Sequence, residues 1–70
     1  MITFNILTRI GTGEYVNVVD AHGRVSVFVD FDSAKRQANV LESAGHTVII
    51  SASDQFGNAT TVYDSASDPT

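Results

Sequence analysis

The chain has 70 residues with no cysteine, eight acidic residues against four lysines and arginines, and a formal net charge of −4. A chain of this length forms one domain that buries only about 60% of the surface its unfolded form exposes, so its stability is small. Without cysteine, no disulfide or thiolate metal site can add to that stability, which makes self-association an expectation. The acidic charge is spread along the chain and argues against a nucleic-acid footprint.

The chain contains nothing near the ~18 consecutive apolar residues of a membrane helix. The first ten residues, MITFNILTRI, have no apolar run of signal-peptide length. We therefore expect a complete small gene product that is cytoplasmic and does not associate with a membrane.

The first half of the chain predicts three strands. Apolar residues alternate with polar ones over residues 2–9, and the glycine-rich stretch 11–14 is a turn. Alternation resumes over residues 14–21, and the loop 21–24 supplies a glycine that can close a hairpin. A third strand is predicted over residues 25–31, where it lies antiparallel to the second.

The apolar period changes after residue 31 to that of a helix. Ala34, Ala38 and Leu41 form a narrow apolar stripe over residues 33–44. Gly45 suits the carboxyl end of this helix, and the amino end is predicted to be capped by Asp32 or Ser33.

Two further strands are predicted over residues 46–52 and 59–64, joined by the turn-forming residues 53–58. The fold class is therefore α+β: a small antiparallel sheet of about five strands, in the order β-β-β-α-β-β, with one helix packed on one face. The domain spans residues 1–64, and the polar tail 65–70 is predicted to be disordered. No internal repeat is visible.

The chain has more apolar strand surface than one short helix can cover. If the odd positions of strand three face the helix, the strand core consists of Ile2, Phe4, Ile6, Val16, Val18, Val25, Val27, Val29, Phe31, Val48, Ile50 and Val62. The opposite face then carries Leu7, Tyr15, Val19, Phe28, Ile49 and Tyr63. A contiguous apolar patch on a small protein usually marks a contact surface, so these six residues are the predicted interface.

Two segments resemble parts of known families. Residues 25–45 resemble the third strand and helix of the AP2-type DNA-binding fold, which implies a sheet that reads DNA with basic and aromatic side chains. The predicted sheet departs from that pattern because Arg9 and Arg24 stand beside Glu14, Asp20 and Asp30. Residues 46–62 resemble the last hairpin of bacterial immunoglobulin-like repeats, which are all-β and longer. We interpret both as local patterns rather than family membership.

No residue pattern specifies catalysis or a metal site. His22 and His46 are interpreted as a turn residue and a helix-end residue, although a metal or base role beside Asp20 or Asp30 is the alternative. Asp30 and Asp32 resemble the start of a calcium loop, but Leu41 stands where a bidentate glutamate is needed. We predict no enzyme activity, no catalytic residue, no cofactor and no metal.

The preferred function is a non-enzymatic interaction protein that self-associates, as a dimer, through an apolar sheet face or edge. It would bind or inhibit a macromolecular partner, most simply a protein, as phage and mobile-element accessory proteins do. A first alternative is a nucleic-acid-binding module that contacts phosphates through Arg9, Arg24, Lys35 and Arg36. A second is a small-ligand binder at a dimer groove lined by Tyr15, Phe28 and Tyr63.

Overall fold

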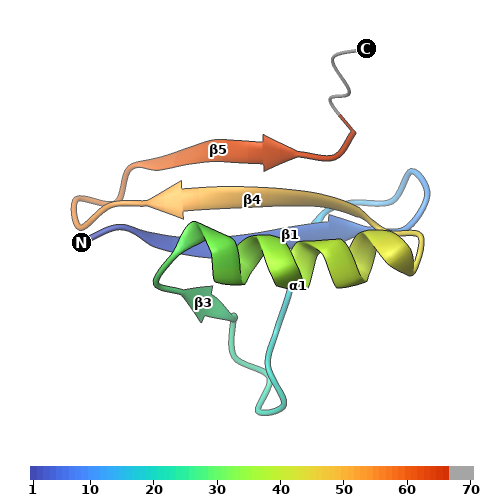
Figure 1. The fold of residues 1–70 in the computed structure, drawn as a ribbon, viewed down its shortest axis with the longest axis horizontal. Helices are drawn as coiled ribbons and strands as arrows, with labels where there is room; N and C mark the ends of the chain where they lie inside the picture. The colour runs from blue at the N-terminus through green and yellow to red at the C-terminus, as the bar shows by residue number, and fades with distance from the viewer. Residues whose placement is uncertain (67–70) are drawn as a thin grey trace.

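A computed structural model describes residues 1–66 of the chain. These residues form one helix and five strands, and the order agrees with the predicted β-β-β-α-β-β arrangement (Figure 1). The elements are β1 (Thr3–Arg9), β2 (Val16–Asn17), β3 (Val27–Phe28), α1 (Phe31–Ser43), β4 (Thr47–Ser53) and β5 (Ala59–Asp64). The predicted fold class, α+β with an antiparallel sheet and one helix on one face, is confirmed.

The sheet is antiparallel throughout and has the order β2-β1-β4-β5, with β3 also paired to β1. Strands β1 and β4 pair along their whole length, from Thr3 opposite Ser53 to Arg9 opposite Thr47. Since β4 occupies one edge of β1, both β2 and β3 lie along the other edge. The two long central strands therefore form the frame on which the shorter ones are added.

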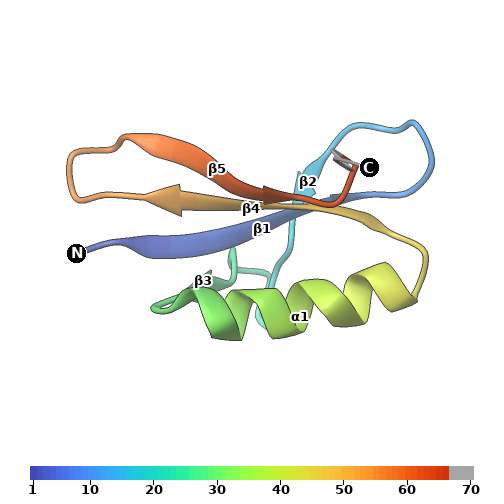
Figure 2. The same cartoon turned by 45° about the horizontal axis from the view of Figure 1, so that its top comes forward.

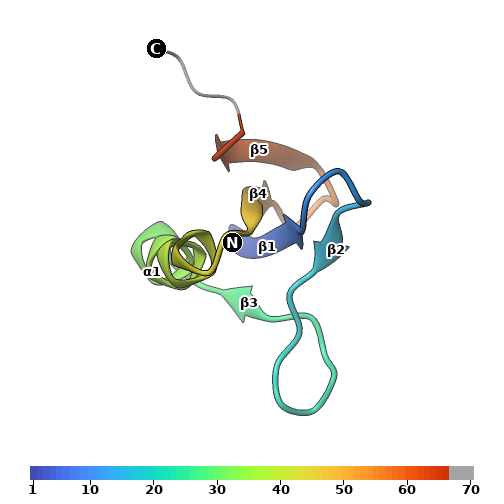
Figure 3. The ribbon, with the colours of Figure 1, turned by 90° about the vertical axis from the view of Figure 1, so that its right-hand side faces the viewer.

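Strands β2 and β3 act as one edge strand that is interrupted by an inserted hairpin. Leu7 pairs with Asn17, and two residues before it in β1, Asn5 pairs with Val27. Between these pairs the chain leaves the sheet as a hairpin over residues 18–26, which we call the arm. Val19 and Val25 form an antiparallel bridge within it, and the arm projects away from both sheet and helix (Figure 3). β2 and β3 each pair with β1 and not with each other, so the predicted antiparallel pairing of the second and third strands is present only as the Val19–Val25 bridge of the arm.

Helix α1 begins two residues earlier than expected. Its N-cap is Asp30, whose carboxylate accepts a hydrogen bond from the backbone N–H of Ser33 at 2.8 Å, so the prediction of Asp32 or Ser33 was wrong. The earlier start places Phe31 in the helix, where its ring meets Phe4 edge to face at 6.0 Å. The third strand consequently stops at Phe28, before the helix cap, and does not reach the predicted residue 31.

The carboxyl end of α1 is closed as the sequence predicts. Gly45 has a φ of 91° and donates to the carbonyl of Glu42, while the N–H of His46 donates to the carbonyl of Leu41. This pair of hydrogen bonds is a Schellman motif, which requires the left-handed backbone that glycine adopts without strain. The chain can then turn directly from the helix into β4 (Figure 2).

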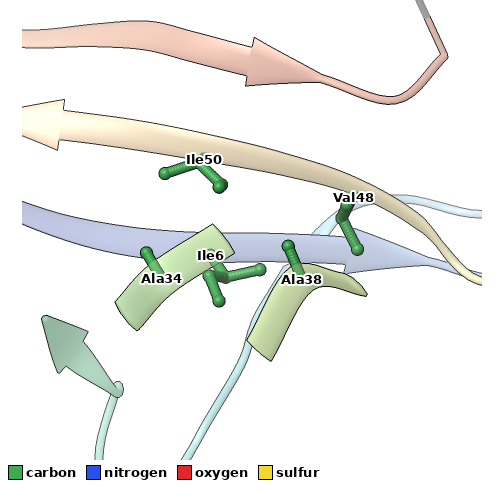
Figure 4. Close-up of a cluster of buried hydrophobic side chains, with 5 residues drawn as sticks. All are labelled: Ile6, Ala34, Ala38, Val48 and Ile50. Carbon is green, nitrogen blue, oxygen red and sulfur yellow. The ribbon is translucent and has the colours of Figure 1, made fainter. Parts of the chain in front are cut away.

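The core lies between α1 and the two central strands. Two alanines of the helix stand directly over β1 and β4 (Figure 4), and their small side chains let the helix approach the sheet closely. The fully buried residues are Ile6, Ala34, Ala38, Val48 and Ile50. Phe4, Val18, Phe28, Phe31, Leu41 and Tyr63 are partly buried against them.

Strand three has the opposite face under the helix from the one predicted. Phe28 pairs with Phe4 and packs against the core, whereas Val25, Val27 and Val29 are exposed. The register follows from the arm, because the chain returns to β1 at residue 27 and directly opposite residues share a face. The exchange buries one phenylalanine ring instead of three valines. Val16 and Ile2, also predicted in the core, are exposed as well.

Strand β5 is shifted by a β-bulge. Ser51 pairs with Thr61 and Ile50 pairs with Tyr63, so Val62 is the extra residue between these two pairs. Without the bulge Val62 would lie opposite Ile50 under the helix, as predicted. The bulge puts Tyr63 there instead and leaves Val62 exposed.

The structured chain continues past the predicted domain end at residue 64. The N–H of Ser65 donates to the carbonyl of Val48 at 3.0 Å, and the N–H of Val48 donates to Ser65 Oγ at 2.9 Å. Ser65 therefore prolongs the contact between the end of β5 and β4. The rest of the predicted tail, residues 67–70, lies outside the described residues.

Candidate functional site: interaction surfaces

The six predicted interface residues do not share a face. Phe28 and Tyr63 lie on the helix-covered face, where they pack against the core. Leu7 and Ile49 form a register pair on the opposite side of the sheet, which we call the open face. The register and the bulge described above cause this division, and neither can be read from alternation alone. The prediction that all six residues lie together in one apolar patch was therefore wrong, because the sheet separates them.

The open face is more polar than predicted. Leu7 and Ile49 are half-buried at its centre, and the amide of Asn5 donates to the side-chain oxygen of Asn17 at 3.0 Å beside them. The remaining positions along β1 and β4 on this face are Thr3, Asn5, Arg9, Thr47, Ser51 and Ser53. Val27, opposite Asn5, adds a third aliphatic side chain at the edge of this face, and the three stand among threonine, serine and asparagine.

Tyr15 contacts Arg9 at the end of the sheet near the turn 11–14. The guanidinium carbon of Arg9 lies 4.6 Å from the centre of the Tyr15 ring, a cation–π contact. Tyr15 is half-buried by this stacking, and Arg9 Nε is buried without a hydrogen-bond partner in the described part of the chain. The pair places a cation next to an aromatic ring at this end of the sheet.

A group of exposed apolar side chains lies on the arm and at the start of β3, where the chain rejoins the sheet. Val19, Val25 and Val27 are 53%, 44% and 59% exposed, and we call them the arm patch. Val19 and Val25 are directly opposite each other, and Val25 and Val27 alternate onto the same side of one strand. Among the predicted interface residues, Val19 is the one in this patch. Sequence reasoning placed its two neighbours in the core.

The arm ends in a turn that an aspartate organises. Asp20 accepts hydrogen bonds from the backbone N–H groups of His22 at 2.8 Å and Arg24 at 3.1 Å, and Gly23 has a φ of 79°. The turn between β4 and β5 repeats this arrangement. Asp54 accepts from Phe56 at 2.8 Å and Asn58 at 3.0 Å, and Gly57 has a φ of 86°. The shared Asp-x-x-Gly pattern, in DAHG and DQFG, is a small repeat that the sequence analysis missed.

Tyr63 joins β5 to the helix through a polar cluster. Its hydroxyl donates to the carboxylate of Glu42 at 2.9 Å, and the ammonium of Lys35 lies 4.3 Å from the ring centre. The Glu42 hydrogen bond, together with burial, raises the pKa of the Tyr63 phenol. Lys35 also donates to Asn39 at 2.7 Å and pairs with Glu42 at 4.0 Å. This cluster links the end of β5 to the helix.

The basic residues proposed for phosphate contacts do not line one surface. Arg9 lies on the open face over Tyr15, and Lys35 lies on the other side of the sheet over Tyr63. Arg24 is on the arm, and Arg36 is exposed on the helix near Asp30. Likewise, Tyr15 is separated by the sheet from Phe28 and Tyr63, so these three do not line one groove.

The two histidines lie in different parts of the folded chain, at the end of α1 and in the arm turn. His46 Nδ1 lies 3.3 Å from Thr8 Oγ1, and His22 is exposed in the arm turn. Within residues 1–66 no three histidine, aspartate or glutamate side chains are grouped so that they could hold a metal ion. In the same range, no helix is long and apolar enough to cross a membrane. The chain matches no protein-family model, no curated protein and no solved structure.

Proposed function

We propose that this chain is a non-enzymatic interaction module that forms a dimer through its arm and then acts on a protein partner. The single observation that carries the proposal is the arm patch, in which Val19 and Val25 are exposed on the projecting hairpin and Val27 is exposed where β3 rejoins the sheet. Covering such an apolar patch removes it from water and so lowers the free energy of the system. The proposal keeps the expected self-association but moves it from the sheet face or edge to the arm.

The arm needs a covering surface for its own stability. A two-stranded hairpin is at best marginally stable in water. In this arm the two strands are joined by the Val19–Val25 bridge and by backbone hydrogen bonds from Ser26 to Val18 and from Asp20 to Arg24. Its outward valines contribute nothing to the core of the same chain. A second copy would stabilise the hairpin by burying that side.

The charges of the arm and the area that a dimer contact requires are both compatible with a second copy as the partner. The arm carries Asp20 and Arg24, one residue of each sign, so a two-fold contact between arms brings no net repulsion. A standard interface buries about 800 Å² per partner. That area is about one sixth of this chain's accessible surface of 4775 Å². The dimer contact would draw this area from the arm together with the adjoining edge of the sheet, on a molecule 33 Å long and 22 Å thick.

The test is the mass in solution of a variant that changes only the polarity of the arm patch. Val19→Thr combined with Val25→Thr keeps the shape and the strand preference of both residues. We expect sedimentation at tens of micromolar to show a dimer for the wild type and a monomer for the variant. Val40→Thr, at an exposed valine of α1, is the matched control and should remain dimeric. A monomeric wild type, or a variant that stays dimeric, contradicts the proposal.

The wider biological role follows from the same reasoning. We expect the dimer to act by binding, and to bind or inhibit a protein in the cytoplasm. Accessory proteins of phages and mobile elements work in this way, and the proposed role belongs to that class.

A further inference from the structure

The outer edge of β5 is a second unpaired surface, on the opposite side of the sheet from the arm. β5 pairs with β4 on one side, and no other strand in residues 1–66 pairs with its outer side (Figure 1). Residues 59–62 are exposed and contain no lysine, arginine or proline, which are the residues that commonly block strand addition at an edge. The bulge at Val62 deflects only the second half of the strand. Its first half therefore presents a straight edge.

The turn fixes which backbone groups of this edge point outward. The N–H of Asp54 donates to the carbonyl of Asn58 at 3.0 Å, so Asn58 faces β4. Hydrogen-bonding direction alternates along an antiparallel pair, and Thr60 therefore also faces β4. The backbone N–H and C=O groups of Ala59 and Thr61 point away from the sheet, where an added strand can reach them.

A shallow pocket of about 230 Å³ adjoins this edge. Ala52 and Thr60, which are a register pair, form part of its wall, and Ile2 adds an apolar side chain. The full lining is Ile2, Ala52, Ser53, Asp54, Asn58 and Thr60. A residue placed opposite Thr60 on an added strand would share its face of the sheet and lie next to this pocket. In strand addition, backbone hydrogen bonds provide affinity and such pockets select alternate side chains.

The charges at the two ends of β5 favour a strand from a different protein over a second copy of β5 as the strand added at this edge. Asp54 and Asp64 lie at opposite ends of the hairpin that contains β5. A second β5 added in the antiparallel sense would bring the Asp64 carboxylate of each copy toward the Asp54 end of the other, so like charges would meet twice. A strand with cations at its ends would meet these carboxylates favourably.

We propose that the outer edge of β5 binds an extended segment of another protein, with alternating apolar side chains and a lysine or arginine at each end. The segment pairs with the outward backbone groups of Ala59 and Thr61 and places an apolar side chain against the pocket beside Thr60. This surface lies across the sheet from the arm, so it is distinct from the proposed dimer contact.

The binding test uses the full chain, labelled with ¹⁵N, and two capped synthetic octapeptides. Both alternate valine and threonine in the middle, but one has lysine at both ends and the other has glutamate. We expect the lysine peptide to shift and protect the amides of residues 59–62, and the glutamate peptide to bind at least about fivefold more weakly. Equal binding of the two peptides, or shifts confined to the arm, would overturn the proposal.

Two pairs of variants separate the backbone contribution from the charge contribution. Thr61→Pro removes an outward N–H and should abolish binding, whereas Thr61→Ser keeps that N–H and should bind as the wild type does. Asp64→Asn should weaken the lysine peptide, whereas Asp32→Asn, the same charge change at the exposed start of α1, should not. If Thr61→Pro does not fold, a lysine peptide N-methylated along its pairing edge tests the same hydrogen bonds on the unaltered protein. Retained binding of that peptide contradicts strand addition.

The outcomes also distinguish this proposal from the dimer. The variant with Val19→Thr and Val25→Thr should bind the lysine peptide with unchanged affinity, because the arm and β5 lie at opposite edges of the sheet. If Thr61→Pro instead converts a wild-type dimer into a monomer, then a second copy occupies the β5 edge and the proposed partner is wrong.

Discussion

The arm and the β4–β5 hairpin have turns of the same kind, but only the β4–β5 hairpin is part of the sheet. Each reverses through an aspartate that accepts two backbone N–H groups and a glycine in left-handed backbone. The strands of the β4–β5 hairpin belong to the sheet, and Val48 and Ile50 of β4 are completely buried. The strands of the arm leave the sheet, and Val19 and Val25 remain exposed.

The difference shows that turn chemistry specifies a reversal but not a place in the sheet. β4 could join the sheet because a full edge of β1 was open to it, with α1 above to cover its apolar side. The chain between Asn17 and Val27 had no such position, because β2 and β3 already shared the other edge of β1. Burial against the helix therefore decides which hairpin becomes part of the core.

The difference in burial between the two hairpins is tested most directly by truncating one aliphatic residue in each. Ile50→Ala should lower the free energy of unfolding by about 3 kcal/mol, because Ile50 is completely buried between sheet and helix. Val25→Ala should change it by less than about 0.5 kcal/mol at concentrations where the chain is monomeric. Urea unfolding followed by circular dichroism measures both. Equal losses would mean that the arm packs as firmly as the sheet.

Phe28 is expected to have the next largest effect, since it anchors the returning end of the arm. Its ring packs against the core opposite Phe4, so Phe28→Ala should cost about 2 kcal/mol. Amide exchange in residues 18–26 should accelerate as well, because the arm loses its attachment. Phe56→Ala in the β4–β5 turn is the control, since Phe56 is 78% exposed. A change of similar size at Phe56 would contradict the assignment of faces.

The two turn glycines allow a smaller but closely matched test. A Cβ atom at Gly23 or Gly57 would meet nothing within 4 Å, so alanine costs only the strain of a positive φ, about 1 kcal/mol. Gly57→Ala should lower the stability of the whole fold, because its turn joins two sheet strands. Gly23→Ala should leave the unfolding midpoint nearly unchanged and speed amide exchange in the arm alone. A shared loss of global stability would show that the arm unfolds together with the core.

Local patterns in the sequence predicted most of the fold. Alternation identified β1, β4 and β5, the stripe of Ala34, Ala38 and Leu41 identified α1, and Gly45 marked its end. These features depend on residues close together in the chain. Element order and fold class followed from them.

The faces of strand three and β5 could not be predicted, because each depends on a single-residue shift relative to a distant neighbour. Phe28 and Val27 compete for the same side of a short strand, and the return point of the arm on β1 decides between them. In β5, the bulge replaces Val62 by Tyr63, whose hydroxyl reaches Glu42 on the helix. For this reason Phe28 and Tyr63 lie on a different face from Leu7 and Ile49, although the sequence predicted all four on one face.

The smallest expected effect is the response of the β4–β5 turn to acid. The hydrogen bonds from Asn58, and that from the N–H of Phe56, hold the pKa of Asp54 below its ordinary value of 3.8. A carboxyl group with a lowered folded pKa stabilises the fold fully above its unfolded pKa and loses that contribution as the pH falls through the folded value. The pKa of Asp30 is lowered in the same direction, by its hydrogen bonds with Ser33 at the helix start.

The free energy of unfolding should therefore be level from pH 7 to about pH 5 and fall below about pH 4. Asp54→Asn should flatten part of that fall, since an amide has no carboxylate to protonate, and Asp30→Asn should flatten a separate part while keeping the N-cap. Urea unfolding at a series of pH values measures both slopes. An acid response that neither substitution alters would show that other carboxyl groups control it. In that case the aspartate would matter to the turn only through its shape, and the two hairpins would differ by burial alone.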